Sequence, residues 1–447
     1  MVKKNVIIMA IFLLVVVLAN GPGEGVVFAE EMKFDANETR VVPRESWQFL
    51  FDDEEYSFQC LRVLGLAATG AADLGEFLTA AYQVKEGDDE GWYNAWYSMG
   101  EHVEGLARDF LKKGHKASAQ EAFFRAWNYY GAAGVFLVAD YNDPRFQESW
   151  QKSRDCFLEG VKLSNGLIQP VEIPFENTTL PGYLCLVDEK TKKRPLLIIQ
   201  TGLDGTAEEL YFVLAVNALK RGYNCLLFEG PGQGRVIRVQ KIPFRPDWET
   251  VVTPVVDFSL TLPQVDKDRI ALAGYSMGGY MAPRAVAYDD RIKACIADGG
   301  VYSIFEGVMS LLSPELQKSI EEGQPAEKVE KLIEQEVDDN PPVKQFLAFM
   351  LWTFQVDSYY DVFEKLKAYT LKDCVDQIQC DMLLVNSNQD KVAGSYEQAK
   401  KLYDVLKSPK TYLEFTEAEG AGEHCQMGAV MIMNEKILNW LDERMNP

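Results

Sequence analysis

The stretch ALAGYSMGGYMAPR, residues 271–284, constrains the fold of this chain more than any other. The apolar residues before Ser276 predict a buried β-strand, and the residues after it suit a helix. Gly274 and Gly278 carry no Cβ atom, so strand and helix can approach each other closely around Ser276. This is the arrangement of a nucleophile elbow. The alternative is a chance match in a glycine-containing loop, and the strand–turn–helix context argues against it.

The chain after Gln169 alternates between short apolar runs and helical stretches. Near-continuous apolar strands that alternate with helices predict a mostly parallel sheet covered on both faces by helices. The predicted fold class is therefore α/β, with a catalytic domain over 166–447. Ligands of such sheets bind at the carboxyl ends of the strands. The runs are RPLLIIQTGLDG, YNCLLFEGPGQG, RIALAGYSMGG, IKACIADGG and CDMLLVNSNQD.

Two further segments are predicted to be helical. Residues 31–165 carry helical signals and few strand signals, which predicts an N-terminal helical domain. Residues from about 303 to 371 form a helical insertion between two strands. Its first half is acidic and suits a solvated face. Its second half is aromatic, and we expect it to cover the active edge of the sheet as a lid.

The first 29 residues are predicted to be a secretory signal peptide. Lys3 and Lys4 precede an apolar run over 6–19, and a small-residue site ends at Ala29. The run is shorter than the about 20 residues that a membrane span needs. We therefore expect a secreted or otherwise extracytoplasmic protein with no stable membrane insertion after cleavage. Retention of the segment as an N-terminal anchor is the alternative.

The net charge and the cysteines limit which binding partners, disulfides and metal sites the chain can have. The formal net charge of −22 disfavours binding to a phosphate backbone, so nucleic acid is not an expected partner. Among the 8 cysteines, Cys374 and Cys380 form the most plausible disulfide by proximity. Cys185, Cys225 and Cys295 lie in strand-like runs and suit buried apolar positions. No cysteine–histidine cluster has zinc-site spacing, and we expect no metal and no cofactor.

A serine nucleophile needs a base and an acid that orients the base. The chain has 3 histidines, and His424 is the one that follows Ser276, in a glycine-rich loop between a strand-like run and a final helix. The acid should stand between them, just past a strand. Asp390 ends the apolar run MLLVNSNQD and fits that place; its rivals, which precede or begin that strand, are Asp373, Asp376 and Asp381.

The tetrahedral intermediate of acyl transfer needs backbone N–H donors. Met277 follows the nucleophile and is expected to supply one of them. The loop QTGLDG should supply the other, from Leu203 or, failing that, Gly202. The segment FEGPGQGR lacks the endings of nucleotide-binding loops and is interpreted as a tight turn at the pocket rim.

Together these motifs resemble those of a known group. The segments IIQTGLDGTAEEL, LLFEGPGQGR, GYSMGGYMAPRA and GEHCQMG look like α/β-hydrolases with an N-terminal helical domain. That group includes FrsA-like esterases, pseudooxynicotine hydrolase and fungal polyketide-shortening hydrolases. The resemblance spans from about Trp92 to the end of the chain. It implies a triad of Ser276, Asp390 and His424, and hydrolysis of an ester or of a carbon–carbon bond next to a ketone.

The leading hypothesis is a secreted serine hydrolase acting on a carboxylic ester or related acyl bond of a small molecule. The alternatives are a carbon–carbon hydrolase acting on β-diketone-type ketones, an acyl-peptidase, and a binding protein on an inactive hydrolase scaffold. A carbon–carbon hydrolase of this group would use an additional acid, for which Glu306 is a candidate. The oligomeric state is left open, a homodimer included.

Overall fold

The computed structural model of the chain describes residues 49–190, 192–338 and 341–445. The predicted signal peptide and the start of the predicted N-terminal helical domain lie outside these residues. The described residues all belong to one compact unit. One hydrophobic core runs through both the N-terminal helices and one face of the sheet, so these two segments are not separate globules.

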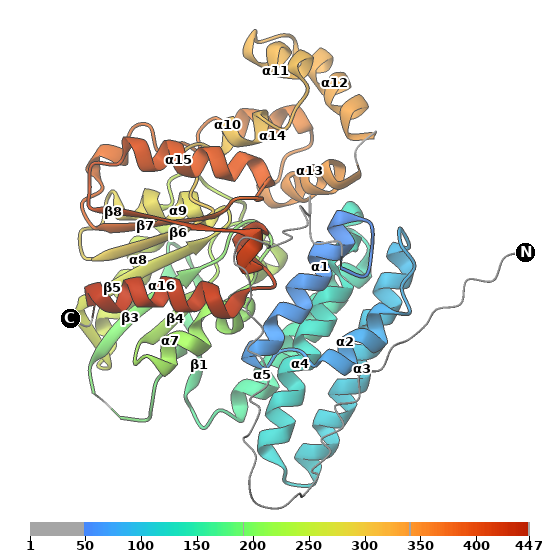
Figure 1. Cartoon of the computed structure of the whole chain (residues 1–447), viewed down its shortest axis with the longest axis vertical. Coiled ribbons are helices and arrows are strands. Elements are labelled where there is room, and N and C mark those ends of the chain that lie inside the picture. Colours follow the sequence, from blue (N-terminus) through green and yellow to red (C-terminus); the bar gives the residue numbers. More distant parts are fainter. Residues whose placement is uncertain (1–48, 191, 339–340, 446–447) are drawn as a thin grey trace, which may run out of the picture. The chain divides into compact units, whose positions relative to one another are not determined.

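Helices fill the described part of the chain before the sheet (Figure 1). Four of them begin at an aspartate whose carboxylate accepts backbone N–H groups of the first turn, namely Asp53, Asp73, Asp88 and Asp143. Gly114, with φ of +82°, turns the chain between two antiparallel helices. The elements are α1 (Glu54–Gly65), η1 (Leu66–Thr69), α2 (Leu74–Ala81), α3 (Asp89–Lys112), α4 (Lys116–Ala133), η2 (Val135–Asp140) and α5 (Pro144–Lys162).

A sheet of 8 strands follows, in the order β1-β2-β4-β3-β5-β6-β7-β8. The pairs β1–β2 and β2–β4 are antiparallel and the other five are parallel, which confirms the predicted mostly parallel sheet. Ile198 of the third strand faces Leu226 on one side and Leu272 on the other. The strands are β1 (Ile168–Phe175), β2 (Thr178–Cys185), β3 (Arg194–Gln200), β4 (Asn224–Phe228), β5 (Val265–Tyr275), β6 (Ala294–Asp298), β7 (Asp381–Ser387) and β8 (Lys410–Phe415).

The sheet separates two hydrophobic cores, because side chains along a strand alternate between its faces. Leu197 and Ile199 join the core that contains the N-terminal helices, α7 and α16. Leu196 and Ile198 join the core on the opposite face, with α8, α9 and α15 (Figure 1). The covering helices are α6 (Ala207–Leu210), η3 (Tyr211–Ala215), α7 (Val216–Lys220), α8 (Glu249–Thr261), α9 (Gly278–Val286), α15 (Ser395–Val405) and α16 (Val430–Met445).

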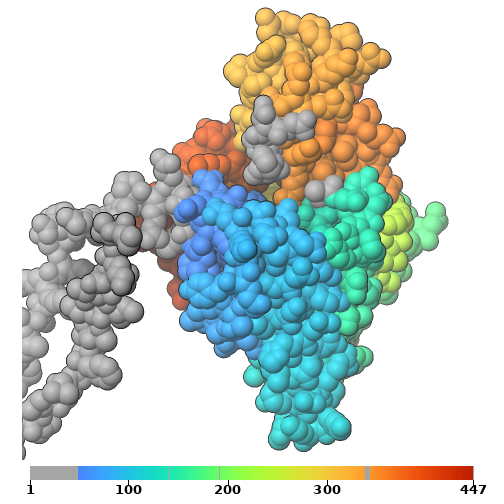
Figure 2. Space-filling view, turned by 90° about the vertical axis from the view of Figure 1, so that its right-hand side faces the viewer, coloured from blue at the N-terminus to red at the C-terminus, as the bar shows by residue number. Residues whose placement is uncertain are grey.

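A helical insertion stands between β6 and β7, as the sequence predicts. Trp352 in this insertion packs edge-on against Phe146 of α5, with ring centroids 5.3 Å apart. Gln345 Nε2 donates to the carbonyl oxygen of Val135 at 3.1 Å. The insertion therefore contacts the N-terminal helices, and Figure 2 shows the two surfaces meeting. Its helices are α10 (Ile304–Met309), α11 (Pro314–Glu321), α12 (Ala326–Asp338), α13 (Pro341–Phe354) and α14 (Tyr359–Leu366).

Several short helical turns lie in the connections between the strands and helices that follow β4. They are η4 (Val236–Gln240), η5 (Val375–Gln377), η6 (Val392–Gly394), η7 (Glu417–Glu419) and η8 (His424–Gln426). Among the described residues, no helix combines the length and the apolar character needed to cross a bilayer.

The predicted disulfide between Cys374 and Cys380 is wrong. All eight cysteines are free thiols. The Cys374 thiol donates to the carbonyl oxygen of Leu371, at 3.6 Å, whereas the Cys380 sulfur lies 3.8 Å from the sulfur of Met382. The two side chains are directed at different neighbours, so closeness in sequence does not bring their sulfurs together.

Candidate active site

Ser276 lies on a strained turn between β5 and α9. Its φ is +59°, a left-handed conformation that costs a non-glycine residue energy. Two contacts hold the turn there. The Ser276 N–H donates to the carbonyl oxygen of Asp298 at 2.9 Å. A Cβ atom at Gly274 would lie 2.2 Å from the carbonyl oxygen of Gly278, so only glycine allows the strand and helix to pack this closely.

The structure brings the three predicted triad residues together. His424 Nε2 lies 2.8 Å from Ser276 Oγ, and His424 Nδ1 lies 2.8 Å from Asp390 Oδ2. Asp390 stands in the loop after β7, and its second oxygen accepts the Val392 N–H at 3.0 Å. His424 begins η8, in the loop after β8. The carboxyl ends of β5, β7 and β8 thus supply one side chain each.

The environment of His424 favours its protonated form. Burial lowers the pKa of His424, but the charge and hydrogen bond of Asp390 outweigh burial and raise that pKa well above 6.5. An imidazole in this setting stabilises a proton taken from Ser276, which is what a general base requires in the transition state.

The loop after β3 lies directly against the turn of Ser276. A Cβ atom at Gly202 would come within 2.7 Å of both Met277 N and Tyr275 O. In the described part of the chain, neither the Leu203 nor the Met277 N–H is bonded to an acceptor. The structure therefore places the loop that carries Gly202 and Leu203 directly beside Met277, as two oxyanion donors from these segments require.

Gln233 holds this loop from the opposite side, a role that the sequence did not reveal. Its Nε2 donates to the carbonyl oxygens of Thr201 and Gly202, both at 2.9 Å. Its Oε1 accepts the Gly230 N–H at 2.8 Å. The side chain is fully buried. The segment FEGPGQGR is thus more than a turn at the rim, since its glutamine fixes the backbone that carries Leu203.

A second buried carboxyl group stands beside the triad and was also missed. Asp298 ends β6, and burial raises its pKa to about 7. Gln426 Nε2 donates to Asp298 Oδ1 at 3.3 Å, while within the described residues Oδ2 has no partner. The only sequence signal was its position at the end of a strand, which it shares with Asp390.

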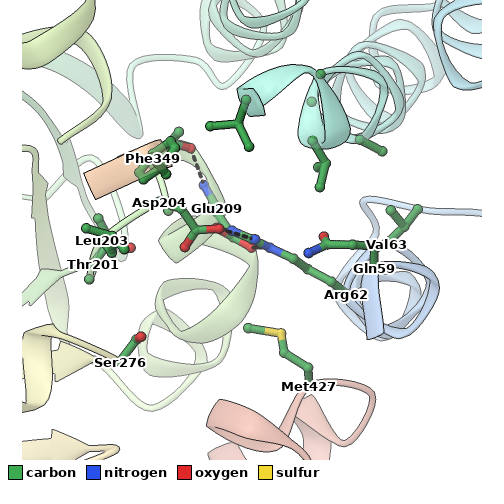
Figure 3. A pocket seen from close by; sticks show the side chains of 18 of the residues that line it. Gln59, Arg62, Val63, Thr201, Leu203, Asp204, Glu209, Ser276, Phe349 and Met427 are labelled. Atoms are coloured by element: carbon green, nitrogen blue, oxygen red, sulfur yellow. Dashed lines mark hydrogen bonds and ion pairs between the residues drawn. The ribbon is translucent and has the colours of Figure 1, made fainter. Parts of the chain in front are cut away.

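Ser276, His424 and the loop after β3 line a cavity of about 350 Å³. Figure 3 shows Ser276 and Leu203 on one side and Gln59 and Arg62 of α1 on another. The helical side includes side chains from α1, α4, α5 and the inserted α13, so the aromatic half of the insertion does border the site. Helical residues that line it include Glu55, Val63, Trp127, Trp150, Phe346 and Phe349.

An ion-pair cluster joins the helical side to the loop after β3 (Figure 3). Arg62 forms two hydrogen bonds to the carboxylate of Glu209, at 2.6 and 2.7 Å. It also donates to Asp204 at 2.6 Å. Arg62 is thereby paired with one carboxylate within the candidate oxyanion loop, Asp204, and one on the helix that follows it, Glu209.

Glu306 does not belong to this site. It is exposed on α10 and pairs with Lys401 of α15, outside the cavity. The expectation that it supplies an additional acid is therefore wrong. The described residues contain no group of three histidine, cysteine or carboxylate side chains arranged to hold a metal ion.

Comparisons with known proteins show the family to which the chain belongs. The model of the family "Esterase FrsA-like" matches residues 87–315. Hydrolyase poxO of Penicillium oxalicum is 32% identical over 89% of this chain and 98% of its own length. The 20-hydroxy-prefusarin hydrolase of Gibberella moniliformis is 33% identical over 88% of this chain and 97% of its own length.

Solved structures share the fold at lower identity. The crystal structure of 2,6-dihydroxy-pseudo-oxynicotine hydrolase matches with a TM-score of 0.68 at 21% identity, over 86% of this chain and 96% of that one. AbyA5 matches with a TM-score of 0.58 at 14% identity, over 84% of this chain and 94% of that one.

Proposed function

Because the chain belongs to the FrsA-like esterase family of α/β-hydrolases, we propose that it is a serine hydrolase cleaving a carboxylic ester or related acyl bond of a small molecule. The observation that carries the proposal is the continuous chain of contacts from Asp390 through His424 to Ser276, both 2.8 Å, at the edge of a cavity. An acyl-enzyme mechanism needs these groups in this order.

In the first half of the reaction, Ser276 Oγ attacks the carbonyl carbon and its proton passes to His424 Nε2. The carbonyl oxygen becomes an oxyanion and accepts from the Met277 and Leu203 N–H groups. The tetrahedral intermediate then collapses, the bond to the alcohol breaks, and the alcohol oxygen takes the proton from His424. Asp390 holds the imidazole in the required tautomer throughout.

In the second half, water attacks the acyl-enzyme and gives its proton to His424. The same two amides stabilise the second oxyanion. Collapse releases the carboxylic acid and returns the proton to Ser276 Oγ. The cycle consumes one water molecule, restores Ser276 and His424, and uses no cofactor.

A fluorophosphonate probe tests this proposal directly. We expect the purified protein to be labelled on Ser276, as mapped by mass spectrometry, and Ser276→Ala and His424→Gln to remove labelling and ester turnover. Ser259→Ala is the matched control, because Ser259 is fully buried on α8 and bonds to the Val256 carbonyl oxygen. Turnover of esters by folded Ser276→Ala protein would contradict the proposal.

A second candidate, hydrolysis of a carbon–carbon bond next to a ketone, is favoured by Glu55. This carboxyl group lines the cavity, and burial raises its pKa although a hydrogen bond from Gln59 opposes the shift. In such a reaction Ser276 attacks one carbonyl, the carbon–carbon bond breaks, and the enolate formed must take up a proton. Glu55 lines the cavity and is a candidate to deliver that proton; the proton that His424 took from Ser276 then returns to Glu55, and water hydrolyses the acyl-enzyme as above.

Turnover of a β-diketone separates the two candidates. The second predicts β-diketone cleavage that falls in Glu55→Gln more than ester cleavage does, with Glu306→Gln as the control carboxylate outside the cavity. Ester hydrolysis without any β-diketone turnover would eliminate carbon–carbon hydrolysis and leave the first proposal standing.

A further inference from the structure

Arg238 is a second arginine in the cavity that contains Ser276 and His424. It lies on η4, a π-helical turn that follows the FEGPGQGR segment. Lys241 ends this turn with φ of +59°. Single π-helical turns are rare and frequently stand at functional sites.

Aromatic rings from two other elements surround the guanidinium of Arg238. Its Cζ lies 4.1 Å from the ring centroid of Phe146 and 5.4 Å from that of Trp150, both on α5. The ring of Trp352 on α13 lies 5.1 Å away. Such faces attract a cation, but they leave its N–H groups without acceptors.

The contrast with Arg62 is sharp. Arg62 has two carboxylate partners, whereas among the described residues Arg238 forms no ion pair and one long hydrogen bond, 3.5 Å to the carbonyl oxygen of Phe146. Burial lowers the pKa of Arg238 to about 9, while the charge of Glu229 acts in the opposite sense. The group therefore still carries its charge at neutral pH, in a partly desolvated place.

Removing a cation from water costs free energy when its N–H donors lack acceptors, unless an anionic partner supplies those acceptors. Guanidinium presents paired donors in a plane that match the two oxygens of a carboxylate. We propose that Arg238 is a substrate-binding residue, and that it receives a carboxylate carried by the substrate away from the scissile bond. This inference rests on the proposed hydrolase function and names the class of its substrate, an anionic ester or ketone.

The competing explanation is purely structural, with Arg238 as a clamp between α5 and α13. The two explanations differ in what a substitution changes. A clamp affects every substrate alike and lowers the thermal stability. A carboxylate subsite affects anionic substrates selectively.

The experiment compares mono(4-nitrophenyl) glutarate with its methyl ester, which has the same glutaryl chain but no charge. We expect the wild type to prefer the anion. Arg238→Gln should lower kcat/KM for the anion by about 10- to 100-fold, mainly through KM, the usual loss for a charge-assisted hydrogen bond. The neutral ester should change by less than about threefold, and Arg238→Lys should keep part of the preference.

Arg145→Gln is the matched control. Arg145 also packs on an aromatic ring, at 4.9 Å from the Tyr93 centroid, but it pairs with Glu90 and Asp143 outside the cavity. Its substitution should leave the preference for the anion unchanged. Equal losses on both esters in Arg238→Gln, together with a lower melting temperature, would overturn the subsite and support the clamp.

A binding measurement keeps this inference separate from the hydrolase proposal. Glutarate is titrated into Ser276→Ala protein by calorimetry, and then into the same protein carrying Arg238→Gln as well. Binding that disappears with Arg238 supports the subsite even if neither ester is hydrolysed and the fluorophosphonate probe fails to label. Absence of glutarate binding at millimolar concentration would overturn it.

Discussion

The two sides of the cavity are built in different ways. On the sheet side, short loops after β3, β5, β7 and β8 hold Ser276, Asp390, His424 and the amide of Leu203 through backbone contacts and buried polar bonds. On the helical side, long side chains from four helices line the space, among them Arg62 and Phe349. The sheet side, or sheet wall, fixes the positions of the proposed reacting groups. The helical side, or helical wall, determines which substrates fit beside them.

This difference predicts how substitutions in each wall affect turnover. Strand ends in a buried parallel sheet are rigid, so a displacement there alters the reacting geometry for every substrate. Helical side chains can be exchanged without moving the strands. We therefore expect substitutions in the sheet wall to reduce turnover in general, and substitutions in the helical wall to redistribute it among substrates.

The largest expected effect of the variants that test this difference comes from Asp390→Asn. Without the carboxylate, His424 loses the contact that raises its pKa and fixes its tautomer. The reaction requires neutral His424, so wild-type kcat/KM should fall as pH drops through a pKa above 6.5. The variant should lose about 10,000-fold at its optimum. Its acid limb should shift to lower pH, since burial alone lowers the pKa.

A pH–rate profile on an activated ester measures both effects, with circular dichroism to establish folding. Asp376→Asn is the control, because Asp376 is exposed and pairs with Lys407 at 2.7 Å. An unchanged acid limb in Asp390→Asn would contradict the assignment of Asp390 as the partner that sets the His424 pKa.

Gly202→Ala should have the next largest effect. Its Cβ would lie 2.7 Å from Met277 N and 2.8 Å from Ser276 Cβ, so the loop must move away from the elbow. Displacing one amide donor of an oxyanion hole costs about 100- to 1,000-fold in kcat. We expect that loss for every ester tested, with KM little changed. A variant that loses activity on one substrate class alone would place Gly202 outside the shared machinery.

The sheet wall could largely be predicted from the sequence, because each of its groups follows a strand whose apolar run is visible. Ser276 has its glycines, His424 is the histidine after it, and Asp390 ends the run MLLVNSNQD. The position of Gln233 was visible as well, inside a glycine-rich turn. Its role was not, because which carbonyl groups an amide side chain meets depends on the packing of β4 beside β3.

The helical wall could not be predicted in the same way. Arg62 and Asp204 stand 142 residues apart, and no local pattern signals that they meet. Glu306 shows the converse error: it follows Ser276 closely in sequence, yet Ser303 caps α10 and that helix carries Glu306 out to Lys401. Long-range side-chain contacts are decided by how helices dock, which residue spacing alone does not encode.

Arg62→Gln probes the junction between the two walls and should have a smaller effect on turnover. It leaves Glu209, which is mostly buried, without its cation, and we expect a loss of about 1–3 kcal/mol in the free energy of unfolding. The loop that carries Leu203 would be held less firmly, so kcat should fall by about tenfold. Chemical denaturation and steady-state kinetics measure the two effects.

Arg125→Gln separates stability from catalysis. Arg125 pairs with Glu76 at 2.8 Å with similar burial, but outside the cavity. It should lose comparable stability without a change in kcat. Equal kcat values in the two variants would mean that the Arg62 cluster stabilises the fold and has no part in holding the loop.

The smallest effect is expected on α3, which does not line the cavity and packs behind the helical wall against α4. Gly105 is exposed within α3, and a Cβ atom there would meet nothing within 4 Å. Since glycine in a helix interior is less favourable than alanine by about 0.5–1 kcal/mol, Gly105→Ala should raise the free energy of unfolding by that amount and leave kcat/KM unchanged for all substrates. Gly100→Ala, five residues earlier on the same helix, should do the reverse, because its Cβ would lie 2.8 Å from the buried ring of Tyr130. A gain in stability at both positions would mean that α3 can shift away from α4, and the helical wall would then be more adaptable than the tight packing of Tyr130 implies.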